Sequence, residues 1–595
     1  MDILLLQEQS GGGSSLKWKT LEHQGPLFPA DYKPHGKPLK LKSELGYIKL
    51  TQEQEETAML YAKYITTDYI QNKTFNKNFW HDWKKILGKD SKIKSLDECD
   101  FTEYKQIIDD EKEVIKNISD PNVSSQIVVD EIIEEHKKEI KGKNKIEEKN
   151  KIEEVNIETN ISRVTYNIDP TEEEKYKVAI VDGNVQPVGN YRMEPPGIFL
   201  GRGDNPNIGK IKKRIYPEDV ILNIGKDAKI PKTLVGHKWG KIIHDRHVEW
   251  LSSWKDNITG KTKYLWLGAS SHFKASSDQE KFDLAKKLKR KIESIRGENE
   301  KNLLNDHKKI RQVATAFYFI DSFALRVGGE KGEDTADTVG VTTLRVEHIT
   351  LHEGNIIILD FLGKDSVRYY NKLEVNPIIY TNIQEFIKDK NKNEDIFDLI
   401  TSQDVNRYLQ TFLKDLTAKV FRTFNASYLF QKEIQKINKK YESLIDTIDK
   451  SILIDEYLKA NTSVAKKLNH QKNVGKSFKD QDEKFLAKIK KIKAQIRKAK
   501  KSSSKKGSSK KGSTKETRLL KLNDTLKKTK LKYELKKEMK NISLGTSKEN
   551  YIDPRIILVF IKKYSIPIEK VFSSALIKKF TWASKFIEEN PEFKF

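Results

Sequence analysis

Residues 476–540 carry the pattern that most restricts the fold of this chain, because their charge opposes burial while their apolar residues repeat at helical spacing. The segment holds 25 Lys and Arg but 7 Asp and Glu, a surplus of +18 within a formal net charge of +25. A tip of Ser, Lys and Gly at 502–514 separates two arms. Apolar residues step by three, four or seven positions along the arms, at Phe485, Ile489, Ile492 and Ile496 and at Leu519, Leu522, Leu526 and Tyr533. We predict two antiparallel helices that form a coiled-coil linker.

The positive charge also predicts a polyanionic partner. A surplus of this size is typical of proteins that bind nucleic acid, since phosphates attract Lys and Arg without any reading of sequence. Two alternatives stay open at this point. The lysine-rich helices are a solvated coiled coil with no partner, or the surplus reflects a chain that is rich in Lys, Asn and Ile throughout.

The length predicts several domains, because 595 residues exceed what one hydrophobic core organises. Residues 101–165 differ in composition from their flanks, with 16 acidic and 11 basic residues and the string Lys-Asn-Lys-Ile-Glu-Glu twice. They are typical of a helical or disordered insertion. We divide the chain into a flexible tail (1–15), a first lobe with that insertion (16–270), a catalytic core (271–473), the linker (474–542) and a C-terminal domain (543–595).

The periodicity predicts a mixed α/β protein. Short apolar runs bounded by turn residues predict strands within 176–270, and 278–440 is predicted to be mainly helical with strands near 356–358 and 366–370. Val405, Leu409, Phe412, Leu416 and Val420 recur at helical spacing. A helix is predicted around Met59 and Leu60, and the aromatic run 79–83 is predicted to be core.

Several classes of protein are excluded or disfavoured. The single cysteine, Cys99, excludes an intramolecular disulfide and a cysteine-based zinc site. The longest apolar runs fall far short of the ~20 residues that span a bilayer, and the N-terminus has no basic region typical of a secretion signal. The phosphate-binding motif Gly-x4-Gly-Lys-Ser/Thr is absent. We expect a soluble intracellular protein with no metal, no cofactor and no membrane partner.

Tyr551 lies in the segment from which the function can be argued. Asp553 is predicted to be a helix N-cap and Pro554 the first helical residue, ahead of an apolar run at 556–561. Tyr551 would therefore lie beside a helix N-terminus, where free N–H groups and the helix dipole favour a phosphate. The alternative is that it is one of 22 tyrosines and simply packs in a core.

A tyrosine that attacks a phosphodiester needs help from cations. Its phenol, of ordinary pKa about 10, must lose a proton. Charge on the phosphate oxygens suits bidentate guanidinium groups, and the leaving oxygen needs a proton that lysine can give. Candidates are Arg326, Lys364, Arg422 and His470. Taken singly, each is better explained as an ordinary surface or ion-paired residue, and spacing does not unite them.

A resemblance unites them. Eight segments resemble the eukaryotic-type (type IB) DNA topoisomerase I family in the same order along the chain: residues 194–204, 216–220, 236–239, 335–340, 344–349, 360–371, 416–422 and 544–555. The likeness runs from about residue 16 to residue 595, apart from 101–165 and the tip of the linker. It implies a two-lobed DNA clamp, with a mixed α/β cap, a mainly helical catalytic domain similar to tyrosine recombinases, and a small helical C-terminal domain.

The resemblance also implies the roles of single residues. Tyr551 would be the nucleophile that forms a 3′-phosphotyrosyl bond, Arg326 and Arg422 would stabilise the pentavalent phosphate, Lys364 would be the general acid, and His470 would bind a non-bridging oxygen. Arg202, Asp365 and Asn550 match positions that contact DNA near the cleaved step. No metal or cofactor is implied. Double-stranded DNA would be the partner of a monomer, in the nucleus of a cell or, for a large DNA virus, in the virion or at the site of viral replication.

Two departures and two rival functions accompany the resemblance. Asn207 stands where the family has lysine, and the loop 329–334 is shorter, so a salt bridge between the lips of the clamp is not predicted. An integrase-like tyrosine recombinase shares the Arg-Lys-Arg-His-Tyr set but would exchange strands between defined sites. A basic coiled-coil DNA-binding protein with inactive catalytic motifs would bind DNA in a salt-sensitive way without relaxing it.

Overall fold

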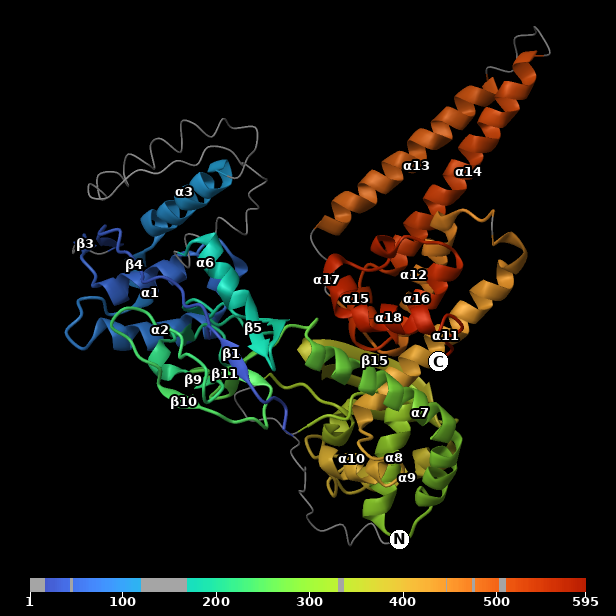
Figure 1. Ribbon diagram of the computed structural model, residues 1–595, viewed down its shortest axis with the longest axis horizontal. Coiled ribbons are helices and arrows are strands. Elements are labelled where there is room, and N and C mark those ends of the chain that lie inside the picture. The colour runs from blue at the N-terminus through green and yellow to red at the C-terminus, as the bar shows by residue number, and fades with distance from the viewer. Residues whose placement is uncertain are drawn as a thin grey trace. The chain divides into compact units, whose positions relative to one another are not determined.

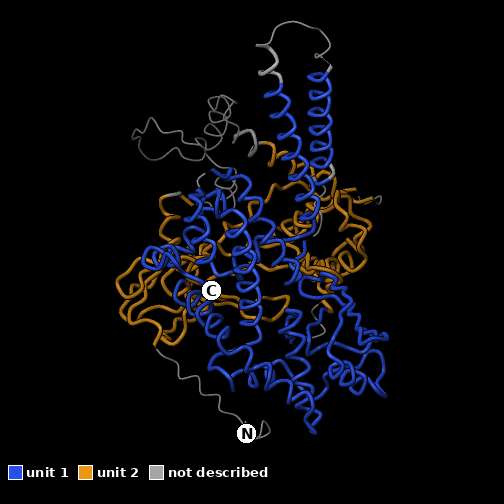
Figure 2. The backbone as a smooth tube through the Cα atoms, turned by 90° about the vertical axis from the view of Figure 1, so that its right-hand side faces the viewer, with its two compact units in different colours: residues 1–9, 275–330, 338–595 blue, residues 10–274, 331–337 orange. Residues whose placement is uncertain are grey.

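The computed structural model describes residues 16–42, 46–118, 168–329, 336–445, 447–472, 477–501 and 510–595. The chain divides into two compact units, drawn in different colours in Figure 2. Unit 1 comprises residues 1–9, 275–330 and 338–595, and unit 2 comprises residues 10–274 and 331–337. The structure is mixed α/β, as predicted, with most helices in unit 1 and most strands in unit 2.

Unit 2 is built on small sheets (Figure 1). The strand orders are β1-β5-β6, β3-β2-β4, β7-β8 and β10-β9-β11-β12, and the pairing is antiparallel except between β9 and β10. The strands are β1 (Leu21–His23), β2 (Leu39–Leu41), β3 (Tyr47–Ile48), β4 (Cys99–Asp100), β5 (Val178–Val181), β6 (Asn184–Pro187), β7 (Gly197–Ile198), β8 (Ile211–Lys212), β9 (Ile221–Asn223), β10 (Lys241–Ile243), β11 (Trp250–Lys255) and β12 (Thr262–Trp266). The strands predicted within 176–270 are confirmed.

The helices of unit 2 are α1 (Gln52–Ala62), α2 (Lys73–Leu87), α3 (Thr102–Ile118) and α6 (Pro170–Glu174). The first three contribute buried side chains to an aromatic core. The predicted helix around Met59 is α1, which begins at a capping box on Thr51. In the predicted aromatic core run, Phe79 and Trp83 are fully buried on one face of α2, whereas His81 is exposed on the other.

The predicted insertion at 101–165 begins inside the core of unit 2. Tyr104 and Ile108, on α3, are buried in the same cluster as Phe79 and Trp83. The acidic composition of the segment did not predict that these two residues are buried. The reason is that α3 is amphipathic, so its charged residues face solvent while its apolar residues pack in the core. The predicted insertion can therefore start only after Ile108. Its residues 119–165 lie outside the described part of the chain.

The described part of unit 1 contains a three-stranded antiparallel sheet, in the order β13 (Ile349–His352), β14 (Ile356–Gly363) and β15 (Val367–Glu374). Gly363 pairs with Val367, so residues 364–366 form the turn of the β14–β15 hairpin. Asp365 and Ser366 have positive φ values of 69° and 57°. This tight left-handed turn positions Lys364 at the end of the hairpin.

Unit 1 contains the helices α7 (His272–Asn302), α8 (Lys308–Phe323), α9 (Pro377–Ile387), α10 (Ser402–Gln410), α11 (Ala418–Lys440), α12 (Lys450–Lys467), α13 (Ser477–Lys501), α14 (Lys510–Glu538), α15 (Leu544–Asn550), α16 (Pro554–Lys563), α17 (Ser574–Lys579) and α18 (Thr581–Glu589). They share one hydrophobic core, which extends from Ala285 to Phe595, except for α13, α14 and α15, whose described residues contribute no buried side chain to it. The ranges 271–473 and 543–595, which we predicted as separate domains, thus contribute to the same core.

The helical spacing from Val405 to Val420 does not correspond to one helix. α10 ends at Gln410 and α11 begins at Ala418. Between them Asp415 has a φ of 65°, a left-handed conformation that an α-helix does not accommodate. Phe412 and Leu416 are buried or half-buried in this connection, so their spacing reflects packing on the core and not helical continuity.

The helices α13 and α14 lie alongside each other (Figure 1). Ile489, Ile492 and Ile496 are buried between them, and the rings of Phe485 and Tyr533 lie 6.1 Å apart. Residues 510–514, predicted as tip, already belong to α14, and the rest of the predicted tip, 502–509, lies outside the described residues. Supercoiling of the pair stays a prediction.

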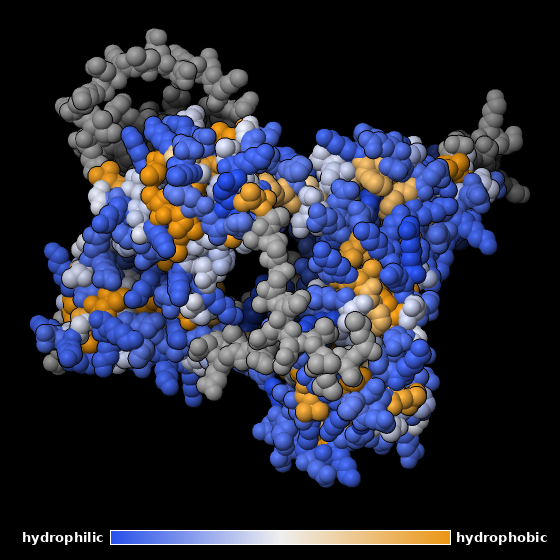
Figure 3. Space-filling model, turned by 60° about the horizontal axis from the view of Figure 1, so that its bottom comes forward, coloured by the Kyte–Doolittle hydropathy of each residue, from blue (hydrophilic) through white to orange (hydrophobic). Residues whose placement is uncertain are grey.

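The face of the molecule drawn in Figure 3 is mainly hydrophilic, with hydrophobic side chains in scattered groups. Among the described residues, no helix combines the length and the apolar character that crossing a bilayer requires.

Candidate active site around Tyr551

Tyr551 lies between two helices. It follows α15 and precedes α16, where the Asp553 side chain accepts a hydrogen bond from the Arg555 N–H at 3.0 Å and Pro554 takes the first helical position. The predicted N-cap is thus confirmed. The backbone N–H groups of Tyr551 and Ile552 both donate to the Ser547 carbonyl, at 3.0 and 2.9 Å. These bonds close the end of α15 and hold the tyrosine backbone.

The helix α11 contributes hydrogen bonds to the same segment. The buried Ser427 hydroxyl donates to the Tyr551 carbonyl at 3.1 Å and accepts from the Asp553 N–H at 3.0 Å. Sequence reasoning missed this residue. The available signal was a serine among buried Phe424, Ala426 and Phe430, where a polar side chain needs a partner.

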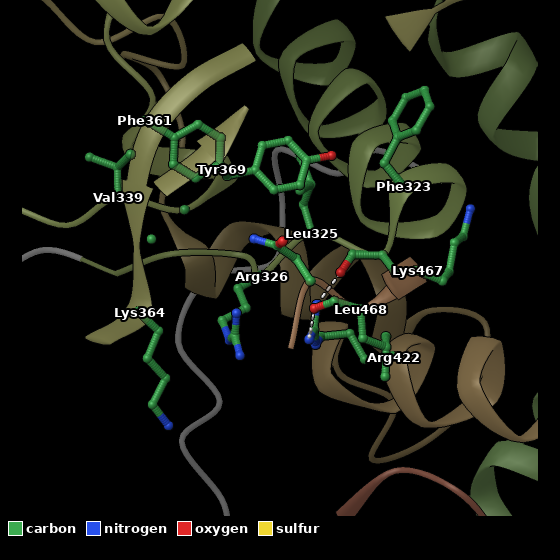
Figure 4. A pocket seen from close by; sticks show the side chains of 14 residues that line it. Phe323, Leu325, Arg326, Val339, Phe361, Lys364, Tyr369, Arg422, Lys467 and Leu468 are labelled. Carbon is green, nitrogen blue, oxygen red and sulfur yellow. Dashed lines mark hydrogen bonds between the residues drawn. The ribbon is translucent and has the colours of Figure 1, made fainter. Parts of the chain in front are cut away.

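Arg422, also on α11, is a buried cation held by the ends of two helices. Its side chain is 3% exposed. Nη1 donates to the carbonyl of Ala324, the C-cap of α8, and Nη2 donates at 3.0 Å to the carbonyl of Leu468, the C-cap of α12 (Figure 4). Helix C-termini offer unpaired carbonyls and negative dipole ends, which stabilise a cation. In the part of the chain that the structure describes, Nε has no hydrogen-bond partner.

The phenol of Tyr551 lies against this cation. The guanidinium carbon of Arg422 is 5.2 Å from the centre of the phenol ring. The centre of the His470 imidazole is 5.1 Å from the centre of the same ring. Burial raises the pKa of the phenol, but Arg422, Arg326 and Lys419 outweigh it, so the pKa of Tyr551 is lowered from its ordinary value. Lys419 was not predicted from the sequence as part of this site.

His470 is 4% exposed and neutral at physiological pH. Its Nδ1 is 2.7 Å from the Ser547 hydroxyl, and its Nε2 is 3.4 Å from Nη2 of Arg422. Burial lowers the pKa of His470 to about 3, with further contributions from Arg422 and Arg326. Ser547 lies within the segment 544–555, and the sequence predicted no role for it.

Arg326 and Lys364 extend toward the same region (Figure 4). Arg326 follows the end of α8 and Lys364 lies on the β14–β15 turn. A polar cavity of about 380 Å³ is lined by Arg326, Lys364, Asp365, Lys419, His470, Asn550 and Tyr551, among others. Arg422 lines a smaller adjoining cavity together with Arg326 and Lys364. The structure therefore brings together seven of the eight predicted site residues.

The eighth residue, Arg202, is exposed and belongs to unit 2. Asn207, one of the two departures from the family pattern, is buried in unit 2, and its N–H donates to the Asn205 side chain at 2.9 Å. The shorter loop 329–334 falls almost entirely outside the described residues. No group of three or more His, Cys, Asp or Glu side chains among the described residues is placed to hold a metal ion.

This arrangement suits an attack on a phosphate. A phenol of lowered pKa lies beside two guanidinium groups and a neutral imidazole, and a flexible primary amine lines the same cavity. Positive groups fixed around one nucleophile stabilise charge that develops on phosphate oxygens without reorganising during the reaction. Because two helix C-termini hold Arg422, its position does not depend on a bound anion.

Comparison with known proteins agrees with this chemistry. Family models described as "Eukaryotic DNA topoisomerase I, DNA binding fragment", "Eukaryotic DNA topoisomerase I, catalytic core" and "C-terminal topoisomerase domain" match residues 16–267, 270–503 and 523–595. DNA topoisomerase 1 beta of Arabidopsis thaliana is 39% identical, over 98% of this chain and 60% of that protein. DNA topoisomerase 1 of Homo sapiens is 36% identical over 97% of this chain and 72% of that protein. DNA topoisomerase 1 of Caenorhabditis elegans is 38% identical over 97% of this chain and 68% of that protein.

The chain thus spans 60% of the length of its Arabidopsis relatives and about 70% of the human and nematode proteins. The three family matches follow one another along almost the whole chain, and the segment with Tyr551 lies in the third. The chain belongs to the eukaryotic DNA topoisomerase I family.

Proposed function

We propose that this protein is a type IB DNA topoisomerase, an isomerase that relaxes positive and negative supercoils without ATP or a required metal. It cuts one strand of duplex DNA through a 3′-phosphotyrosyl intermediate, lets the free end rotate, and reseals the strand. The observation that carries the proposal is the contact of the Tyr551 phenol with a buried arginine and a neutral histidine in a cavity lined by further cations.

Each catalytic residue has a role that its environment supports. Tyr551 attacks the phosphorus, and its lowered pKa eases loss of the phenolic proton. Arg422 and Arg326 neutralise the charge that builds on the non-bridging oxygens. Lys364, exposed on its turn, gives a proton to the departing 5′-oxygen, and His470 donates a hydrogen bond to a non-bridging oxygen.

The reaction needs no nucleotide because the bond energy is conserved. Attack by the phenol forms one phosphodiester as it breaks another, and the 5′-hydroxyl reverses the exchange with the tyrosine as leaving group. The guanidinium groups supply the charge stabilisation that metal ions supply in two-metal nucleases. Neither step consumes water.

The proposed architecture is a clamp around duplex DNA. Unit 2 forms the cap lobe, with Arg202 near the cleaved step, and unit 1 forms the catalytic lobe, with Asp365 and Asn550 beside the DNA. The helices α13 and α14 form the coiled-coil linker, whose lysines attract DNA without sequence preference. We propose that the protein acts as a monomer in the nucleus, or at the site of viral replication if its source is a large DNA virus.

The test is relaxation of negatively and positively supercoiled plasmid in EDTA without ATP. We expect the native protein to relax both, and Tyr551→Phe to relax neither while it still binds DNA. Tyr564→Phe is the matched control, because Tyr564 is buried in the same core and its hydroxyl has no hydrogen-bond partner among the described residues. Full activity of Tyr551→Phe would mean that another residue is the nucleophile.

The same assay separates the rivals. A recombinase would join strands between two defined sites and depend on those sites for cleavage. An inactive DNA-binding protein would bind in a salt-sensitive way, with no relaxation and no covalent complex after denaturation. A protein–DNA adduct that survives denaturant and carries the DNA 3′ end is the result that the proposal requires.

A further inference from the structure

Ser547 places a hydroxyl against the nitrogen of His470 that faces away from Arg422. The Ser547 side chain is 0% exposed, and its Oγ lies 2.7 Å from Nδ1 of His470. The backbone carbonyl of the same residue holds the N–H groups of Tyr551 and Ile552. One residue therefore contacts the imidazole through its side chain and the tyrosine segment through its main chain.

The contacts of His470 decide which of its nitrogens carries the proton. A guanidinium group has only N–H donors, so at 3.4 Å from Nη2 of Arg422 the Nε2 atom must be the acceptor. In a neutral imidazole the proton is then on Nδ1. Ser547 Oγ consequently accepts the hydrogen bond from Nδ1–H in the absence of DNA.

This arrangement is the opposite of what the reaction needs. To donate a hydrogen bond to a phosphate oxygen, His470 must carry a proton on Nε2, because Nδ1 is directed at the buried serine. Protonation of both nitrogens is opposed by burial and by the guanidinium groups of Arg422, from α11, and Arg326, from the segment after α8. Lys364 and Lys419 add positive charge to the same cavity, and Asp365 adds negative charge. The phenol of Tyr551, whose pKa is lowered, lies beside the ring. A neutral imidazole with its proton moved to Nε2 resolves this conflict.

We propose that Ser547 is a positioning residue whose hydroxyl reverses its hydrogen bond so that His470 can exchange tautomers when DNA binds. Without DNA, Ser547 accepts from Nδ1–H; with a phosphate in place, it donates to Nδ1 while Nε2–H turns to the phosphate oxygen. The Nδ1 proton passes to water and Nε2 takes a proton from water, so the hydronium and hydroxide that these steps form neutralise each other and the charge of the imidazole does not change. A hydroxyl both donates and accepts, whereas a carboxylate would hold the proton on Nδ1. The inference rests on the proposed function.

The direct test is nitrogen-15 NMR of histidine-labelled protein in the Tyr551→Phe background, which stops the reaction before cleavage. The His470 signals are identified by their loss in a His470→Gln variant. We expect the Nδ1–H tautomer in the free protein and the Nε2–H tautomer with a cleavable DNA duplex. The same tautomer in both states, or an imidazolium in the complex, would overturn the proposal.

Kinetics test the role of the serine itself. In single-turnover cleavage we expect Ser547→Ala to be at least about tenfold slower with an unchanged Kd for DNA, and Ser547→Thr to recover most of the rate. His470→Ala with Ser547→Ala should be no slower than His470→Ala alone, because the serine acts only through the ring. Additive losses would indicate a merely structural role. Melting temperatures of all variants exclude unfolding.

A second control removes a hydroxyl that does not touch the ring. Ser463→Ala loses only a local bond, from Oγ to the Lys459 carbonyl at 3.2 Å on α12, and is expected to cleave at the native rate. If the native protein does not cleave DNA at all, the proposed function fails. If it cleaves and Ser547→Ala cleaves equally fast, the inference about Ser547 alone fails.

Discussion

The protein uses positive charge in two contrasting ways, in the cavity around Tyr551 and along α13 and α14. In the cavity, Arg422 is 3% exposed and hydrogen-bonded to two helix C-termini. On the two helices, the apolar seam is buried while Lys488, Lys490 and their neighbours are exposed. The first region has few charges in fixed positions, and the second has many in water.

The difference teaches that burial, and not the number of charges, determines what a cation can do. Around a buried charge the effective dielectric is low and salt screens little, so Arg422, together with Arg326 and Lys419, lowers the pKa of the neighbouring phenol despite its burial. Solvated lysines interact weakly one by one, but together they attract a polyanion and release its counterions.

Arg422→Lys tests the fixed charge and should have the largest effect. Lysine keeps the charge but cannot reach both carbonyls and the tyrosine with a planar, forked group. We expect single-turnover cleavage to slow by about 10²–10³-fold, the range for loss of one preorganised charge stabiliser. Arg407→Lys is the control, because Arg407 is exposed and paired with Asp404 at 2.7 Å. A rate within about twofold of the native rate would contradict a special role for the buried site.

Ser427→Ala tests how the nucleophile is held. The substitution leaves the buried Asp553 N–H without its partner, which costs about 1–3 kcal/mol. We expect a lower melting temperature and slower cleavage with little change in DNA affinity. Loss of affinity with normal cleavage of bound DNA would show that Ser427 does not position Tyr551.

His470→Gln tests burial through pH. An unfolded histidine binds a proton near its ordinary pKa of 6.5, whereas the folded protein binds it only near pH 3. Acid therefore favours unfolding between these values, and stability rises with pH up to about 6.5. The variant should lose less stability than the native protein between pH 7 and 5, by at most about 2 kcal/mol. His307→Gln, at an exposed position, should behave like the native protein.

Replacement of four exposed lysines on α13 should have the smallest effect. With Lys488, Lys490, Lys491 and Lys493 changed to Gln, we expect the slope of log affinity against log salt to fall by about 0.9 for each phosphate that the protein no longer neutralises. Cleavage of DNA already bound should keep its rate within about twofold. A large loss of that rate would mean that these lysines act on the site itself, which would remove the contrast between the two regions.

Local rules predicted the parts of the molecule whose cause lies in neighbouring residues. Asp553 and Pro554 begin α16 because a capping side chain and a missing N–H suit that position. The two apolar seams of the lysine-rich segment produced α13 and α14 for the same reason, since the spacing that buries Ile492 is intrinsic to a helix. The resemblance to a family supplied the set of five catalytic candidates, which spacing did not unite.

Tertiary packing decided the rest. The residues from Val405 to Val420 recur at helical spacing in a region predicted to be mainly helical, but α10 ends at Gln410 and the chain turns at Asp415 before α11 begins. The acidic composition after Phe101 predicted an insertion, but Tyr104 and Ile108 anchor α3 in the core. Neither feature is visible locally, because each depends on which distant residues cover the apolar side chains.

The sequence by itself determined which side chains are available for chemistry at Tyr551 and how its helix begins. Only the tertiary structure decided that Arg422 lies under the phenol, that two helix C-termini hold it, and that Ser427 and Ser547 secure the tyrosine and His470. The physical reason is that capping and periodicity act over a few residues, whereas the pKa of a buried group depends on charges that the fold brings together from more than 200 residues apart in the chain.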